Sequence, residues 1–107
     1  MDSAPHGDIM EFWNDRAIIL GLRRLRLIGK SRQEKLRNRW REWKAADPDG
    51  ALAFLEDVME EIKASGFLRG ENDRNWKVTF DWLIENDRNA VKVAEGQYRN
   101  GEKMKWR

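Results

Sequence analysis

Apolar residues recur at helical spacing along three long segments of the chain. The first segment predicts a helix that Asp8 caps and Gly21 ends. Its apolar positions are Ile9, Phe12, Trp13, Ala17 and Leu20. After a break at residues 47–50, a broader stripe predicts a helix that Asp47 caps and Gly66 ends. Its apolar positions are Leu52, Phe54, Leu55, Val58, Met59 and Ile62.

The segment between these two helices is strongly basic. Ser31 and Glu34 have the spacing of a capping box, which predicts a further helix from Ser31 through Lys44. Its narrow apolar stripe consists of Leu36, Trp40 and Trp43. Basic residues flank the stripe on both sides, with Arg37, Arg41 and Lys44 on one shoulder and Arg32, Lys35 and Arg39 on the other. Residues 22–30, LRRLRLIGK, have no period that decides between a helix and an extended connector.

The stretch NWKVTFDWLI, residues 75–84, fits two periods. As a strand it would place on one face the alternate residues Trp76, Val78, Phe80 and Trp82. As a helix it would form one stripe from Trp76, Phe80, Leu83 and Ile84. The helical alternative leaves Val78 and Trp82 on a second face, where they meet another element or a partner.

A short last helix follows, capped at Asn86-Asp87, carrying Val91 and Ala94 and ending at Gly96. Together these segments predict an all-α fold, a small compact domain of four to five short helices. We assign residues 8–100 to a single helical domain, residues 1–7 to a disordered N-terminus and residues 101–107 to a flexible basic tail.

Composition restricts the chemistry that the chain can perform. It has no cysteine, which excludes disulfides, thiolate metal sites and cysteine nucleophiles and is typical of a cytoplasmic protein. Its single histidine, His6, precedes the first predicted helix and has no obvious catalytic partner. No apolar run approaches the length of a membrane span. We therefore expect a soluble, cytoplasmic, non-enzymatic protein without a metal or another cofactor.

Charge is segregated along the chain, although the net charge is only +2. Residues 16–46 carry eleven Lys or Arg against two Asp or Glu, and acidic segments lie on both sides. Such a basic block is typical of a surface that binds nucleic-acid phosphates. The predicted phosphate contacts are Arg23, Arg24, Arg26, Lys30, Arg32, Lys35, Arg37, Arg39 and Arg41. The alternative is that acidic faces of the helices before and after this block pair with these bases within the domain.

Six tryptophans are many for 107 residues. Trp13, Trp40, Trp43 and Trp76 lie on apolar stripes and are predicted to be buried. Trp82 lies off the main stripe of a helical 75–84, and Trp106 lies in the basic tail. Because exposed indoles commonly anchor protein interfaces, these two are the predicted partner-binding residues.

Residues 65–100 resemble the C-terminal region of phage and prophage DNA replication proteins, namely replication initiators and replisome organisers. The shared pattern is Ser-x-Phe-Leu-x-Gly, a polar loop, Trp-x-x-x-Phe-Asp-Trp-Leu and Lys-Val-x-Glu-Gly-x-Tyr. Here it comprises Ser65, Phe67, Leu68, Gly70, Trp76, Phe80, Asp81, Trp82, Leu83, Lys92, Val93, Glu95, Gly96 and Tyr98. A weaker likeness extends upstream to Ser31. The sequence departs from the family pattern at Ala90, Ala94 and Arg99. Family members usually carry an N-terminal winged-helix domain, which these 107 residues do not include.

The resemblance implies a small helical module that acts in DNA replication. It identifies no catalytic residues. It also favours the helix at residues 75–84, because family members tolerate proline or alanine at the place of Val78. We therefore expect an accessory or initiator-like DNA-binding module. The alternative is a protein-interaction module that recruits or inhibits a replication protein of the host, such as the replicative helicase or its loader.

Overall fold

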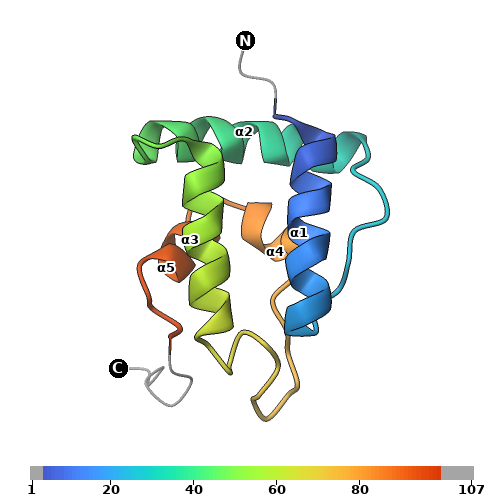
Figure 1. Cartoon of the computed structure of the whole chain (residues 1–107), viewed down its shortest axis with the longest axis vertical. Coiled ribbons are helices and arrows are strands. Elements are labelled where there is room, and N and C mark those ends of the chain that lie inside the picture. Colours follow the sequence, from blue (N-terminus) through green and yellow to red (C-terminus); the bar gives the residue numbers. More distant parts are fainter. Residues whose placement is uncertain (1–3, 100–107) are drawn as a thin grey trace.

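The computed structural model describes residues 4–99, which form five helices and, within this range, no strand (Figure 1). The helices are α1 (His6–Leu20), α2 (Lys30–Ala46), α3 (Ala51–Lys63), α4 (Phe80–Ile84) and α5 (Asn89–Ala94). The predicted all-α class is confirmed. The predicted basic tail, residues 101–107, and with it Trp106 lie outside the described residues. No helix within residues 4–99 is long and apolar enough to cross a membrane.

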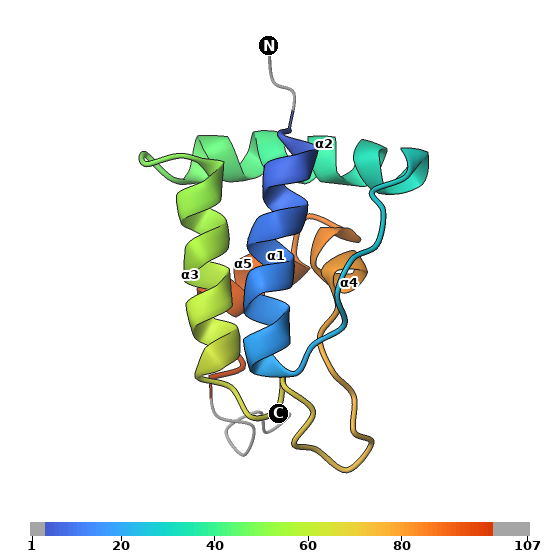
Figure 2. The same cartoon turned by 45° about the vertical axis from the view of Figure 1, so that its right-hand side comes forward.

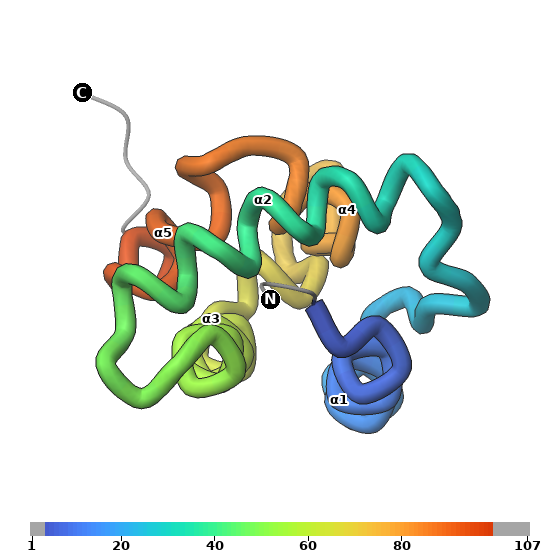
Figure 3. The backbone as a smooth tube through the Cα atoms, turned by 90° about the horizontal axis from the view of Figure 1, so that it is seen from above, coloured from blue at the N-terminus to red at the C-terminus, as the bar shows by residue number. Residues whose placement is uncertain are grey.

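Helices α1 and α3 run side by side in the same direction, and α2 crosses over the N-terminal ends of both (Figures 1 and 2). Residues 22–29 return along the molecule from the end of α1 to the start of α2 (Figure 2). Viewed from above, α4 and α5 lie on the opposite side of α2 from α1 and α3 (Figure 3). The two short helices, α4 and α5, therefore complete the core that the three long helices form.

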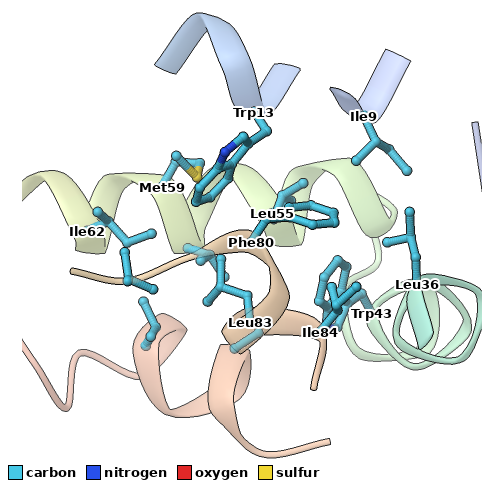
Figure 4. Close-up of a cluster of buried hydrophobic side chains, with 14 of the residues drawn as sticks. Ile9, Trp13, Leu36, Trp43, Leu55, Met59, Ile62, Phe80, Leu83 and Ile84 are labelled. Carbon is cyan, nitrogen blue, oxygen red and sulfur yellow. The ribbon is translucent and has the colours of Figure 1, made fainter. Parts of the chain in front are cut away.

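The core forms where the apolar stripes of these helices meet (Figure 4). Trp13 of α1 packs edge-on against Phe80 of α4, with ring centroids 5.6 Å apart. Trp43 of α2 stacks on Phe54 of α3 at the same centroid distance. The predicted stripe of α3 is buried with one exception, since Leu52 is 42% exposed. Aromatic contacts thus join α1 to α4 and α2 to α3.

Three predicted helix starts are wrong. Helix α1 begins at His6, so Asp8 lies in its first turn and does not cap it. Because Ala4 is buried, residues 4–7 belong to the fold and not to a disordered N-terminus. Helix α2 begins at Lys30, and Ser31 forms no side-chain cap. Helix α3 begins at Ala51 and not directly after Asp47, the predicted cap. The Asp47 carboxylate instead accepts the N–H of Asp49 at 2.8 Å in a local turn.

The stretch at residues 75–84 combines its two predicted periods. Helix α4 covers only its second half, and the N–H of Val78 bonds to the carbonyl oxygen of Leu68 at 2.9 Å. Thr79 is extended and caps the helix by accepting the N–H of Trp82 at 3.1 Å. The helix favoured for the whole stretch is therefore wrong in its first half. Val78 is fully buried and is not part of a second surface.

The last helix begins at Asn89, with Arg88 and not Asn86-Asp87 at the cap position, so its predicted start is also wrong; it ends as predicted but turns a different face inward. The side chain of Asn86 accepts the N–H groups of Arg88 and Asn89, both at 2.9 Å. Gly96 has a positive φ of 80°, which glycine adopts without strain after the helix. Its buried residues are Ala90 and Val93, whereas the predicted Val91 and Ala94 are only partly buried.

Candidate nucleic-acid interface

Residues 22–29 form an extended connector that is held firmly against α1. Apolar residues at every third position, Leu22, Leu25 and Ile28, are buried. The side chain of Asn14 accepts the N–H of Leu25 at 2.7 Å and donates to its carbonyl oxygen at 2.9 Å. The indole N–H of Trp13 donates to the carbonyl oxygen of Arg23 at 2.9 Å. With its backbone fixed in this way, the connector presents its arginines to solvent.

These arginines line an open hollow at the start of α2. The hollow has a volume of about 480 Å³, and we call it the basic hollow; it is lined by Arg23, Arg24, Arg26, Leu27, Gly29, Lys30, Ser31 and Arg32. Leu27 stands exposed among these bases, at 69%. The four bases Arg23, Arg24, Arg26 and Lys30 are exposed, and none forms an ion pair with another residue of the described part of the chain. Their charge is available to a ligand.

The two basic shoulders of α2 have different surroundings. On the shoulder beside α4, Arg32 binds Asp81 at 2.7 Å and Lys35 binds Glu85 at 2.8 Å. Arg39 on the same shoulder binds Glu42, one turn along the helix, at 2.9 Å. We call Arg32, Lys35 and Arg39 the tethered shoulder. The acidic partners come from α4 and from α2 itself, and not from the helices before and after the basic block, as the internal-pairing alternative expects.

The opposite shoulder of α2 is exposed. Arg37 and Arg41 are one turn apart on this face, and Lys30 lies on the same face two turns before Arg37. Within residues 4–99, neither Arg37 nor Arg41 forms an ion pair. We call Lys30, Arg37 and Arg41 the open shoulder. Lys30 also lines the basic hollow, and six of the nine predicted phosphate contacts are therefore exposed without an ion pair within residues 4–99.

Arg32 connects this surface to α4. Its Nε and Nη2 atoms donate to the two carboxylate oxygens of Asp81 at 2.7 and 3.0 Å, and its Nη1 atom donates to the carbonyl oxygen of Leu27. The hydrogen bonds from Arg32 lower the pKa of the Asp81 carboxyl below its usual value, and Asp81 raises the pKa of Arg32. Arg32 is therefore a link between the connector and α4, with less freedom to bind a phosphate.

Replacement of Asp81 by asparagine tests this link. A lowered folded-state pKa stabilises the protein above the unfolded value of roughly 4, and this stabilisation disappears as the pH falls through the folded value. We expect D81N to lower the free energy of unfolding at pH 7 by at most about 1 kcal/mol, because solvent screens the half-exposed pair. The difference from wild type in urea unfolding shrinks below pH 4. An equal difference at pH 3 and pH 7 contradicts the link.

Comparison of the two shoulders provides a matched test of the interface. We expect the open-shoulder pair Arg37→Ala and Arg41→Ala to weaken DNA binding about tenfold, at roughly 0.7–1 kcal/mol for each lost contact. The tethered-shoulder pair Lys35→Ala and Arg39→Ala removes the same charge from the same helix and should change the affinity less than threefold. Fluorescence anisotropy measures both variants. Equal losses would show that net charge, and not this face, sets the affinity.

The tryptophans divide between the core and a second hollow. Trp13, Trp40 and Trp43 are buried as predicted, whereas Trp76 is only partly buried. Trp82 is also partly buried and lines a pocket of about 630 Å³ with Phe67, Asn72, Asp73, Arg74, Trp76 and Tyr98. We call this the aromatic pocket. Phe67 and Tyr98 were not predicted as site residues, because no sequence period joins positions 67, 76, 82 and 98.

Within residues 4–99, no group of three or more His, Asp or Glu side chains is placed to hold a metal ion. The acidic face of α3 instead provides Glu61, which pairs with Arg99 after α5. Comparison of the chain with models of protein families, with curated proteins and with solved structures finds no match.

Proposed function

We propose that this chain is a non-enzymatic DNA-binding module. The observation that carries the proposal is the set of six exposed bases in the basic hollow and on the open shoulder that form no ion pair within residues 4–99. Each base can neutralise one phosphate without first breaking an ion pair within the domain. All three bases of the tethered shoulder, by contrast, are paired with acidic residues.

The rigidity of the connector supports the same function. An arginine on a flexible loop loses conformational entropy when it binds, and fixing its backbone beforehand reduces that cost. Asn14 and Trp13 fix the connector at two adjacent points, on either side of Arg24. The exposed Leu27 adds an apolar group that can contact a sugar or the edge of a base.

The cellular setting that we propose is DNA replication of the phage or prophage type, as an accessory or initiator-like module. This setting rests on the resemblance of residues 65–100 to replication proteins. The bases of the proposed surface lie outside that stretch, at residues 23–41. DNA binding and the replication setting can therefore be tested separately.

A salt titration of wild-type protein tests DNA binding. If all six bases contact phosphates, the affinity should fall about a thousandfold between roughly 50 and 200 mM salt. Mobility shifts with a duplex and with a single strand of the same length measure the slope for each, and the steeper slope with tighter binding identifies the preferred form. Absence of binding at low salt, or binding that does not change with salt, refutes the proposal.

A second function is favoured by a separate observation, the aromatic pocket that contains Trp82. In this function the chain recruits or inhibits a replication protein of the host, such as the replicative helicase or its loader. Residues of the aromatic pocket and of the basic surface do not overlap. One chain can thus hold DNA and a protein partner at the same time.

A further inference from the structure

Four aromatic rings line the aromatic pocket, and each ring contacts two of the others. Trp76 meets Trp82 at a centroid distance of 5.3 Å and an angle of 75°, and Trp82 meets Tyr98 at 6.0 Å and 78°. Phe67 stacks on Tyr98 at 6.0 Å and 10° and reaches Trp76 at 5.8 Å. Each ring is only partly buried. Trp82 is therefore nearly perpendicular to both of its neighbours, whereas Phe67 lies nearly parallel to Tyr98 and is tilted by 37° from Trp76.

The loop that supplies Trp76 is fixed by one asparagine. The side-chain amide of Asn72 donates to the carbonyl oxygens of Phe67 and Trp76 at 3.0 and 2.8 Å. Its oxygen accepts the N–H groups of Arg74 and Trp76 at 3.1 and 2.9 Å. On the other side of the pocket, the side chain of Asn89 donates to the carbonyl oxygen of Trp82 at 2.7 Å. The pocket is thus formed before any ligand binds.

Three polar groups on these rings have no partner within residues 4–99. They are the indole N–H groups of Trp76 and Trp82 and the hydroxyl of Tyr98; the indole N–H of Trp13, by contrast, bonds to the backbone. The Tyr98 hydroxyl is protonated at neutral pH, as in any tyrosine with the ordinary pKa of about 10, and burial raises its pKa further. None of these three groups is buried, and accessible donors beside apolar rings are suited to a ligand that offers carbonyl oxygens.

The charged residues at the rim decide between possible ligands. Asp73 and Arg74 both line the pocket and are exposed, and their charges cancel. A cation would meet Arg74, and a phosphate would meet Asp73. The two near-perpendicular contacts of Trp82 also suit compact rings better than one wide flat base, which stacks on a single open ring face. The geometry therefore favours a neutral ligand with small apolar rings and carbonyl oxygens.

We propose that the aromatic pocket binds a proline-rich, extended segment of a protein partner. Polyproline II segments dock in grooves lined by aromatic rings, because their shape is preformed and their backbone carbonyl oxygens are not bonded internally. Proline rings would pack on the faces of Trp82 and Tyr98, and the indole N–H groups would donate to the carbonyl oxygens of the peptide. This inference rests on the second function above and names its class of partner; it does not depend on DNA binding.

Nuclear magnetic resonance of the isotope-labelled full chain tests the proposal without any substitution. The probes are a capped decaproline peptide, a glycine-serine peptide of the same length and a single strand of thymidylate. We expect decaproline to shift the indole N–H signals of Trp76 and Trp82 and to leave that of Trp13 unchanged. Absence of shifts with millimolar decaproline, or equal shifts with the glycine-serine peptide, overturns the proposal. Shifts with thymidylate alone would assign the pocket to bases and overturn it as well.

Two substitutions at Trp82 distinguish the contribution of its aromatic ring from that of its indole N–H donor. We expect Trp82→Phe to weaken decaproline binding about fivefold, because it keeps an aromatic ring and loses one hydrogen bond of roughly 1 kcal/mol. Trp82→Ala should weaken binding more than tenfold. Circular dichroism checks that each variant is folded; since the Phe variant keeps the ring contacts, it provides the measurement if the Ala variant does not fold. Unchanged affinity of a folded Trp82→Phe variant refutes the role of the donor.

The same titration is then repeated on the variant with Arg23, Arg24 and Arg26 replaced by alanine. Decaproline binding should be unchanged in this variant, because none of these arginines lines the aromatic pocket. If wild type binds DNA and not decaproline, only the inference about the pocket fails. If wild type binds decaproline and not DNA, only the DNA-binding proposal fails. Loss of decaproline binding in the arginine variant contradicts two separate surfaces.

Discussion

Replacing Arg23, Arg24 and Arg26 together by alanine should lower the affinity for DNA roughly a hundredfold at low salt. Each arginine is exposed and lines the basic hollow, so each substitution removes a phosphate contact of about 1 kcal/mol. The backbone of Arg23 and Leu25 is held through its own N–H and carbonyl groups, which remain in the variant. The substitutions should therefore leave the connector in place.

The salt dependence gives the sharper measurement of this variant. The slope of log affinity against log salt should decrease by about 0.9 for every duplex phosphate contact that is lost, or nearly three for the triple variant. The matched control replaces three exposed bases elsewhere, Lys63, Arg74 and Arg88, by alanine and has the same net charge. If the control loses as much affinity as the connector variant, binding is a property of net charge and the basic hollow has no special role.

The second large effect concerns the stability of the fold. We expect Phe80→Ala to lower the free energy of unfolding by about 3–5 kcal/mol, the usual cost of removing a buried phenyl ring. Phe80 is almost completely buried, and its ring meets the edge of Trp13 across the core (Figure 4). Because domains of this size have roughly 5–15 kcal/mol of stability, the variant loses a large part of it. Urea unfolding followed by circular dichroism measures the change.

Leu52→Ala is the control for this substitution. The sequence pattern assigns Leu52 to the buried stripe of its helix, which predicts a loss of about 2–5 kcal/mol. The structure leaves this side chain 42% exposed, so the expected loss is below about 1 kcal/mol. A small effect of Phe80→Ala together with a large effect of Leu52→Ala would contradict the burial of Phe80 and the exposure of Leu52.

Much of the helical architecture could be predicted from the sequence, because apolar spacing reports directly on burial. The stripe Leu36, Trp40 and Trp43 is buried as its period indicates. Helix starts were harder to predict, since several residues compete to begin a helix within one turn. At residues 47–51, Gly50 has a φ of 104°, a conformation that strongly favours glycine, and the helix begins only after it.

The candidate site could be predicted in composition but not in detail. The sequence indicates two basic shoulders on one helix and gives no reason to prefer either. Asp81 and Glu85 decide between them, and they lie about 50 residues from their partners Arg32 and Lys35. Contacts over such distances depend on how α4 packs beneath α2, which no local pattern records. The aromatic pocket is subject to the same limit, because its four rings come from the connection between α3 and α4, from α4 itself and from the residues after α5.

The one-turn helix α4 has a consequence for how this protein can change over evolutionary time. Its consecutive residues Asp81 and Trp82 face different neighbours: Asp81 holds Arg32 beside the basic hollow, and Trp82 forms a wall of the aromatic pocket. A substitution that rotates or lengthens this helix must therefore alter both surfaces together. Although the two surfaces share no residues, both depend on the position of α4. Selection on either surface therefore constrains the other.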